Sequence, residues 1–211
     1  MSSIRRNGER MLDKVREVVR SQCEEGDWKY HVVVVIKYAK QLARELDADE
    51  DLAELGALLH DIGRIAVAGG DPDHEIVGVP IAEEILKEQG YSQEVIEEVK
   101  HCVESHRASK GIPPKTTTAR IVADADAMAH FDAVPALIQL ALKMENNDLE
   151  KAVQWVYEKI ERDWNRKLTL PEAREMMKDK YDAIRLILAP TLGEAFVPDW
   201  SSNDSVLPKW E

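Results

Sequence analysis

The chain has 211 residues, of which 44% are hydrophobic and 32% charged, a balance typical of a folded domain and not of a disordered chain. Its net charge of −12 argues against binding to duplex nucleic acid, because that affinity comes mainly from Lys and Arg side chains that neutralise phosphates. The longest apolar run, Val32–Ile36, is far shorter than the ~20 residues of a membrane span, so no membrane contact is expected.

The first residues and the cysteines indicate the compartment. Basic residues follow Met1, but the apolar stretch of a signal peptide is absent behind them. Only two cysteines, Cys23 and Cys102, are present, which is too few for a disulfide scaffold. These features predict a cytoplasmic protein with reduced thiols, and they leave open whether it forms a homo-oligomer.

Helical periodicity dominates the sequence in chain order. Apolar residues at i, i+3, i+4 and i+7 predict a helix from about Trp28 to Leu46, although its four consecutive valines could suggest a strand. Further helices are expected at about residues 52–60, 74–89, 92–106, 119–131, 136–143, 149–164 and 171–188. Because alternating β-rich runs are few, the predicted fold class is all-α, with one helical domain over residues 1–188. Residues 189–211 carry three prolines and no clear period, so an irregular C-terminal tail is expected.

Local signals mark several helix ends. Asp47 and Glu50 have the spacing of a capping box for the helix that follows them. Gly90 is expected to end one helix and Ser92 to cap the next. The threonines at 116–118 are expected to cap the helix that begins near Ala119.

The dipeptide His60-Asp61 ends an apolar helix. An imidazole and a carboxylate in adjacent positions can both reach one cation if the helix ends there and the backbone turns. This donor set suits Mn, Fe, Co, Ni, Zn or, less well, Mg. On the same helix face as His60 lie the small residues Ala53, Gly56 and Ala57, which would let a second helix approach closely enough to add another ligand.

The other histidines differ in their setting. His31 lies at the edge of an apolar stripe, where a single histidine is more often a structural residue than a ligand. His106 shares its stripe with apolar residues and is the better candidate for pointing at a core site, whereas His101 falls on the opposite side of the same helix. His130 has no supporting pattern and is interpreted as a structural or surface residue.

Two carboxylates, Asp124 and Asp126, lie within an otherwise apolar helix. A buried carboxylate needs a cation or hydrogen bonds, because desolvation of an unpaired charge is costly. Residues two apart are separated by roughly 200° around a helix, so one ion is not expected to bind both. The plainer interpretation is that one aspartate is exposed and the other caps or pairs with an arginine such as Arg120.

Together these residues resemble the HD-domain superfamily of metal-dependent phosphohydrolases. The resemblance is carried by His31, by the Leu-Leu-His60-Asp61-Ile-Gly-Arg64 stretch and by the Ala-Asp helix around Asp124 and Asp126. His74 followed by Gly78, and the segment ending at His106, resemble further family elements. The similarity covers about residues 27–133, and the C-terminal third contains no motif of the family.

The resemblance implies a compact HD-type helical bundle and a divalent metal site. His31, His60, Asp61 and one of Asp124 or Asp126 would bind the first ion, and Asp126 is favoured because Met128 follows it at the usual spacing. Members with two ions use additional histidines. For this second site the candidates are His74 with His106, or His101, with Asp61 as the bridge. A cyclic-dinucleotide phosphodiesterase is disfavoured, because Cys102 and Gly111 depart from the pattern of that class.

The resemblance also implies a reaction. A divalent ion can lower the pKa of a bound water to ~7 and so provide a nucleophile at neutral pH. Asp61 would orient that water, and the guanidinium of Arg64 would contact a substrate phosphate, unless it is simply a solvated charge at a helix end. The expected activity is hydrolysis of a phosphate ester or anhydride, on a nucleotide or another small phosphorylated metabolite.

Two other functions stay open. Some HD-domain proteins hold two irons and activate dioxygen, as in myo-inositol oxygenase, and the additional histidines allow this here. Alternatively the chain is a non-catalytic, metal-stabilised binding module that uses its acidic surface and the tail with Trp200 and Trp210 for protein contacts.

Overall fold

The computed structural model describes residues 3–66, 73–107 and 111–193, and every regular element within these ranges is helical, which confirms the all-α prediction. None of the helices in these ranges is both long enough and apolar enough to cross a bilayer. The elements in chain order are α1 (Ser3–Gln22), α2 (Glu25–Asp27), the π-helical turn η1 (Trp28–Val32), α3 (Val33–Glu45), α4 (Glu50–Leu59), α5 (Ile62–Ala66), α6 (His74–Glu88), α7 (Gln93–Ser105), α8 (Thr117–Asp132), α9 (Val134–Met144), α10 (Leu149–Arg162), the π-helical turn η2 (Asp163–Lys167), α11 (Pro171–Leu188) and the 3-10 turn η3 (Ala189–Leu192).

The helices predicted from periodicity are all present, with small shifts at their ends. The run of valines lies in η1 and α3, so helix rather than strand is correct there. Three helices were not predicted: α1 and the short helices α2 and α5. The signal for α1 is nevertheless in the sequence, because its buried side chains Leu12, Val15 and Val19 repeat at intervals of three and four.

Helix caps agree with the sequence in two cases out of three. Ser92 accepts a hydrogen bond from the backbone N–H of Val95, and Thr116 caps α8 in the same way. The prediction of a cap at Asp47 is wrong. The cap of α4 is Asp49, whose carboxylate accepts from two backbone N–H groups, while Asp47 itself has a φ of 51°.

The first four residues of the expected irregular tail are helical. Ala189–Leu192 form the 3-10 turn η3, and Ala189 is fully buried, so these residues continue the α11 layer. The turn ends at Gly193, whose φ of 73° is favourable for glycine. The remainder of the predicted tail, including Trp200 and Trp210, lies outside the described residues.

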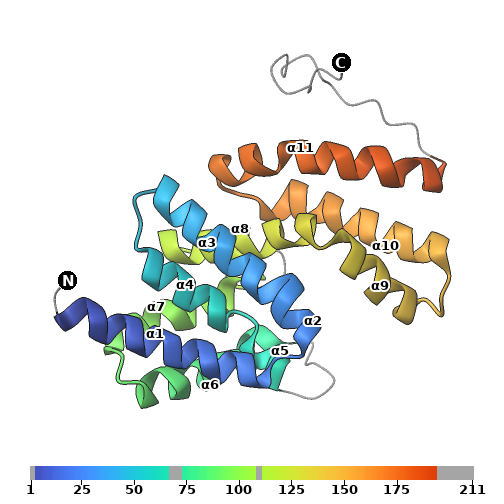
Figure 1. Cartoon of the computed structure of the whole chain (residues 1–211). Coiled ribbons are helices and arrows are strands. Elements are labelled where there is room, and N and C mark those ends of the chain that lie inside the picture. The colour runs from blue at the N-terminus through green and yellow to red at the C-terminus, as the bar shows by residue number, and fades with distance from the viewer. Residues whose placement is uncertain (1–2, 67–72, 108–110, 194–211) are drawn as a thin grey trace, which may run out of the picture.

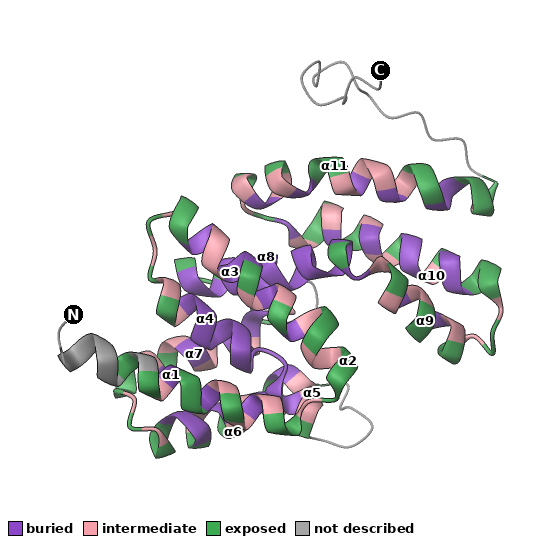
Figure 2. Ribbon diagram, viewed as in Figure 1, coloured by how far each residue is buried: buried purple, intermediate pink, exposed green. Residues whose placement is uncertain are grey.

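Helix α8 is the central element of the molecule. Figure 1 shows it between one group of helices that contains α1, α4, α6 and α7 and a second group formed by α9, α10 and α11. Along Thr118–Phe131 every residue of α8 except Arg120 is buried, as the colouring of Figure 2 illustrates. One apolar cluster joins α8 to α3 and the C-terminal helices, and a second joins α1, α4, α6 and α7. The functional side chains lie beside α8, near the boundary of these two clusters.

Candidate metal centre

Four imidazoles and two carboxylates from separate parts of the chain converge beside α8. Most of them come from helix ends, where the backbone turns and adjacent side chains can face the same point. The six residues are His31 in η1, His60 and Asp61 at the end of α4, His74 at the start of α6, His106 at the end of α7, and Asp126 in α8.

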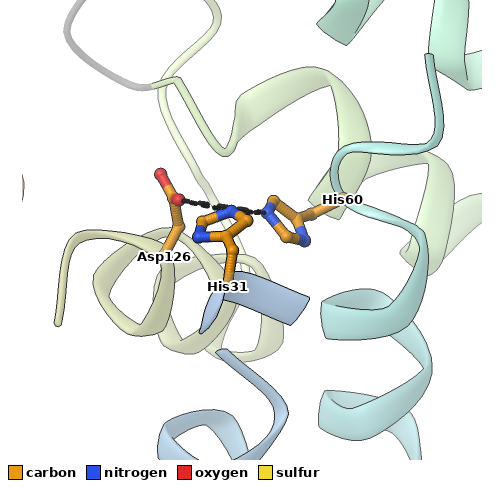
Figure 3. Close-up of side chains that lie close together, drawn as sticks. All are labelled: His31, His60 and Asp126. Atoms are coloured by element: carbon orange, nitrogen blue, oxygen red, sulfur yellow. Dashed lines mark hydrogen bonds and ion pairs between the residues drawn. The ribbon is translucent and has the colours of Figure 1, made fainter. Parts of the chain in front are cut away.

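The first group consists of His31, His60, Asp61 and Asp126, and Figure 3 shows three of its members facing one another. The Nε2 atoms of His31 and His60 lie 3.1 Å apart, and Asp126 Oδ1 lies 3.5 Å and 3.9 Å from them. Asp61 Oδ2 lies 3.3 Å from His31 Nε2 and 3.7 Å from His60 Nε2. Donor atoms bound to one ion at ~2.0–2.2 Å lie about 2.8–4.4 Å from one another, depending on the angle at the ion, so these separations fit a single cation.

A second group lies on the other side of Asp61. Asp61 Oδ1 is 3.1 Å from His74 Nε2 and 3.4 Å from His106 Nε2, and these two nitrogens are 3.3 Å apart. Each oxygen of Asp61 therefore faces a different set of imidazoles. This is the arrangement of a carboxylate that can bridge two ions, and it matches the role that the sequence resemblance assigned to Asp61.

Hydrogen bonds on the far side of two rings show that their inner nitrogens are suited to a metal. His60 Nδ1 donates to the carbonyl of Ala57 and His106 Nδ1 donates to that of Val103, both at 2.7 Å. A carbonyl only accepts, so the proton of each neutral ring is on Nδ1 and its Nε2 carries a lone pair. Both lone pairs point toward Asp61 and toward other imidazoles, and a divalent cation fits this set of donors.

The electrostatics favour the same protonation states. Burial lowers the pKa of His60 to about 4, which keeps the ring neutral. Burial raises the pKa of Asp61, but His60 and the imidazoles around the carboxylate hold it well below its usual value. The same balance, with Lys167 as the nearest cation, holds the pKa of Asp126 well below its usual value. Neutral imidazoles and ionised carboxylates are the forms that bind metals.

Two glycines explain why His74 comes so close to Asp61. A Cβ on Gly63 would lie 2.1 Å from the carbonyl oxygen of His74 and 2.6 Å from the backbone nitrogen of Gly78. The glycine of the His-Asp-Ile-Gly stretch thus lets α5 touch the first turn of α6. Gly78, one turn after His74, also lacks a side chain, so its backbone can lie directly against Gly63. This contact explains the His-x-x-x-Gly spacing physically.

Close packing of α4 also follows the sequence prediction. A Cβ on Gly56 would lie 2.9 Å from a methyl group of Val122 in α8 and 3.2 Å from the sulfur of Cys102 in α7. The small face that ends in His60 therefore lets two helices approach, one of which carries Asp126.

The two aspartates of α8 have different surroundings, and neither of the plainer expectations is correct. Both are buried, and neither pairs with Arg120. Asp124 faces away from the imidazoles and accepts hydrogen bonds from the backbone N–H groups of Thr169 and Leu170 and from the Thr169 hydroxyl, at 2.8–3.0 Å. Of the two alternatives for a metal ligand, only Asp126 lies among the imidazoles.

His101 does not join either group. Its Nδ1 lies 2.8 Å from Glu104, and its Nε2 accepts a hydrogen bond from the backbone N–H of Lys115. The alternative that placed His101 in the second metal site is therefore wrong, because those contacts hold the ring on the other side of α7.

Arg64 lies beside the first group. Its Nε is 3.0 Å from Asp61 Oδ2, and its Nη2 is 3.8 Å from Asp27. The side chain is about one-third exposed and lines the pocket described below. Arg64 is therefore not a fully solvated charge, because it pairs with Asp61, one of the candidate metal ligands.

Two residues that contact Asp126, His130 and Lys167, were not among the predicted site residues. His130 is buried, so a surface position is wrong; its Nε2 lies 3.7 Å from Asp126, and its ring stacks on His31 with centroids 5.5 Å apart. Its Nδ1 is 2.8 Å from Asp163. Lys167 Nζ contacts Asp126 Oδ2 at 3.2 Å, opposite the oxygen that faces the imidazoles. A signal for His130 existed, because it follows Asp126 by four residues on the same helix face.

A pocket of about 440 Å³ opens onto the first group. Apolar side chains of α9 and α10 form part of its wall, and two of its apolar residues are notably exposed, Tyr30 at 50% and Leu140 at 46%. Cations of both halves of the chain also line it: Arg64, Arg107, Lys143, Lys159 and Lys167. The pocket therefore joins a metal centre to a cationic and partly apolar surface.

Comparison with known proteins indicates the same family as the sequence motifs. The family model for the HD domain matches residues 28–130. Among curated proteins, a tRNA (cytidine(56)-2'-O)-methyltransferase of Picrophilus torridus is 36% identical over 132 residues, which are 58% of this chain and 37% of that protein. A Ribonuclease Y of Desulforudis audaxviator is 32% identical over 124 residues, 55% of this chain and 22% of that protein. The chain thus spans less than two fifths of these relatives.

Solved structures resemble the chain over most of its length. Bacillus subtilis YpgQ, solved in complex with ADP, superposes with a TM-score of 0.68 at 21% identity, covering 88% of this chain and 95% of YpgQ. A predicted HD superfamily hydrolase from an uncultured Thermotogales bacterium superposes with a TM-score of 0.58 at 25% identity, covering 86% of this chain and 91% of that one. The likeness therefore includes the C-terminal helices that the family model does not match.

Proposed function

This chain is a member of the HD-domain superfamily, and we propose that it is a metal-dependent phosphohydrolase that cleaves a phosphate ester or anhydride of a nucleotide or another small phosphorylated metabolite. The observation that carries the proposal is the convergence of His31, His60, Asp61 and Asp126 within the spacing of a single cation. A divalent ion bound there would activate water as the nucleophile and polarise the phosphoryl group.

We assign the first ion to that group and a second ion to Asp61, His74 and His106. Asp61 is in contact with both sets of imidazoles, so it would hold the two ions together and accept a hydrogen bond from the attacking water. Lys167 contacts the outer oxygen of Asp126 and keeps the inner oxygen directed at the imidazoles. Mn, Fe, Co, Ni and Zn suit this mixture of nitrogen and oxygen donors better than Mg does.

Arg64 is assigned to the substrate. It lies within 3.0 Å of a carboxylate oxygen at the edge of the metal centre, and its guanidinium lines the pocket. A planar guanidinium can bind two oxygens of one phosphate at once and stabilise the charge that develops on them. The same side chain also holds Asp61, so it links substrate binding to the position of that carboxylate.

The pocket supports a small phosphorylated substrate. Its cations would bind phosphate, and its exposed apolar side chains, among them Tyr30 and Leu140, would cover a base or another planar group. The structural neighbour YpgQ was solved with ADP, a ligand of this class. The two free cysteines agree with our proposal of a cytoplasmic location.

The test is reconstitution of the full chain. The protein is stripped with a chelator, reloaded separately with Mn, Co, Ni, Fe, Zn and Mg, and screened against nucleoside mono-, di- and triphosphates and against simple phosphomonoesters. We expect metal-dependent release of phosphate or pyrophosphate, and elemental analysis should give one or two ions per chain. Absence of release with every metal and substrate would refute the proposal.

The second candidate function is a di-iron oxygenase, and the bridging position of Asp61 between two sets of imidazoles favours it. Against it stands the cationic pocket, since five Lys and Arg side chains suit a phosphorylated substrate. Two tightly held irons with a mixed-valence signal and substrate-dependent uptake of dioxygen would support the oxygenase.

A further inference from the structure

Three charged residues repeat every fourth position where α10 passes into η2. Lys159, Asp163 and Lys167 share one face, and they lie outside the region that the HD family model matches. Asp163 is fully buried between the two lysines, with Lys159 Nζ at 3.6 Å and Lys167 Nζ at 3.7 Å. Its other contact is His130, which adjoins Asp126. The C-terminal third thus reaches the metal centre through Asp163.

The two lysines have unequal partners. Lys167 lies between two carboxylates, Asp163 and Asp126, so its charge is balanced within the protein. Lys159 is only 14% exposed, and Asp163 is its one ion-pair partner among the residues the structure describes, at a distance too long for a strong hydrogen bond. Lys159 is one of the residues that line the pocket. A desolvated ammonium with one distant partner can accept a further anion.

The segment Asp163–Lys167 forms a turn of π-helix, as does the segment that carries His31 at the candidate metal centre. η2 is a turn of π-helix closed by a hydrogen bond of 3.0 Å from Leu168 N–H to the Asp163 carbonyl, and it carries both Asp163 and Lys167. The other π-helical turn, η1, carries the candidate ligand His31. Such turns are rare and occur often at functional sites. Both π-helical turns contribute residues to the lining of the pocket, among them His31 of η1 and Lys167 of η2.

We propose that Lys159 binds a second phosphate of the substrate, beyond the phosphoryl group at the metal centre, so that the pocket selects nucleoside di- or triphosphates or similar polyphosphorylated metabolites over monophosphates. This inference rests on the proposed function and narrows it. A phosphoryl group at the imidazoles would lie near Arg64 and Lys167. Lys159 is one step farther, separated from Asp126 by the Asp163–His130 pair, and only a longer anion would reach it.

The pocket's charge agrees with a substrate that carries several negative charges. Its lining includes five cations and four carboxylates, and two of those carboxylates, Asp61 and Asp126, are candidate metal ligands. Once a divalent ion is bound, the balance becomes strongly positive, although the chain as a whole has a net charge of −12.

The test measures binding rather than turnover. The full chain loaded with Mn is titrated calorimetrically with inorganic pyrophosphate and, separately, with orthophosphate. For Lys159→Gln we expect the Kd of pyrophosphate to rise about ten- to a hundredfold, the loss of one charge-assisted hydrogen bond. The Kd of orthophosphate should change less than about threefold. Lys151→Gln is the matched control, since Lys151 is exposed on the same helix and pairs with Asp148.

A purely structural role for Lys159 would give a different result. If Lys159 only neutralises Asp163, then Lys159→Gln should lower the melting temperature, and the double change Lys159→Gln with Asp163→Asn should restore stability and pyrophosphate binding together. Our inference requires that the double variant still binds pyrophosphate weakly, and that Lys159→Arg retains most of the affinity. Unchanged pyrophosphate affinity in Lys159→Gln, or an equal loss for both anions, would overturn it.

Failure of this inference and failure of the proposed function are distinguishable. Metal-dependent hydrolysis with no effect of Lys159→Gln on pyrophosphate binding would keep the phosphohydrolase and remove the role of Lys159. Lysine-dependent pyrophosphate binding without any hydrolysis would support the subsite while refuting the enzymatic activity.

Discussion

The region matched by the HD family model and the C-terminal helices α9–α11 reach the same pocket by different means. Residues 28–130 supply the candidate metal ligands, most of them at helix ends or in a turn and Asp126 within α8. The C-terminal helices supply Lys143, Lys159 and Lys167 and part of the apolar wall, and no motif marks them. The first region thus holds the residues that the HD family model matches, and under the proposed function the second region would help to select the substrate.

Helix α8 shows how the two regions are joined. Asp126 faces the imidazoles, whereas Asp124, two residues earlier, accepts three hydrogen bonds from the segment that precedes α11. Two aspartates on one helix therefore have different partners, because their positions differ by roughly 200° around the helix axis. Asp126 would bind a metal ion. Asp124 attaches the segment before α11, and with it the C-terminal helices, to α8.

The largest expected effect is on metal affinity and activity, in which variants of these two aspartates should differ. Asp126→Asn should reduce activity and metal affinity by more than about 100-fold, since the loss of a direct ligand costs more than the loss of an outer hydrogen-bonding partner. It should also lower the free energy of unfolding of the metal-free protein, because the buried Lys167 loses one of its two carboxylate partners. Metal content by elemental analysis and turnover on the best nucleotide substrate measure the two consequences.

Asp124→Asn is the matched control and should leave metal binding intact. The amide oxygen can still accept from the two backbone N–H groups but carries no charge, so the weaker hydrogen bonds should destabilise the protein by about 1 kcal/mol or less. Metal stoichiometry should stay at the wild-type value. If Asp124→Asn lost metal and Asp126→Asn kept it, the assignment of the two residues would have to be exchanged.

Sequence patterns predicted the fold class and most helices, and they named the six residues that the structure brings together at the candidate metal centre, because helical periodicity and the His-Asp motif are local signals. The residues alone left Asp124 and Asp126 open, and only the family resemblance favoured Asp126, since their difference depends on where the segment before α11 lies relative to α8. Lys159 and Lys167 were missed for a related reason. Lys167 is far from Asp126 in the sequence but 3.2 Å from it in space, and Lys159 is connected to Asp126 through Asp163 and His130, so no motif marks either lysine.

The next prediction concerns the HD region alone. Gly63→Ala should destabilise the protein by about 3 kcal/mol, at the upper end for overpacking, because the new methyl group would meet backbone atoms of His74 and Gly78, which cannot rotate away. α6 would have to move away from α5, and His74 would move with it. Urea unfolding measures the stability, and metal stoichiometry should fall from two ions toward one if both sites are filled in the wild type.

Gly8→Ala serves as the control for Gly63→Ala. A Cβ at Gly8 would have no atom within 4 Å, and the residue lies inside α1, so alanine should be neutral or stabilising by roughly 0.5–1 kcal/mol. Equal stability of the two variants would show that the close approach of α5 to α6 is not required.

The smallest expected effect tests the second junction between the two regions, which is Asp132 at the end of α8. Tyr38 of α3 donates to its Oδ2 at 2.6 Å, and Lys180 of α11 pairs with its Oδ1. Burial raises the pKa of Asp132, but the hydrogen bonds from Lys180 and Tyr38 outweigh it, so the pKa lies below its usual value. Asp132→Asn should therefore reduce the free energy of unfolding by about 1 kcal/mol at neutral pH.

The pH dependence shows whether charge is the reason. A carboxylate with a lowered folded-state pKa contributes stability that is complete above its unfolded value of about 3.9 and is lost as the pH falls through the folded value. The difference between wild type and Asp132→Asn should thus be constant from pH 6 to 8 and shrink below about pH 4. Asp179→Asn, an exposed change on the same helix as Lys180, should give no such trend. A difference that is independent of pH would mean that shape rather than charge joins α11 to the HD region at this point.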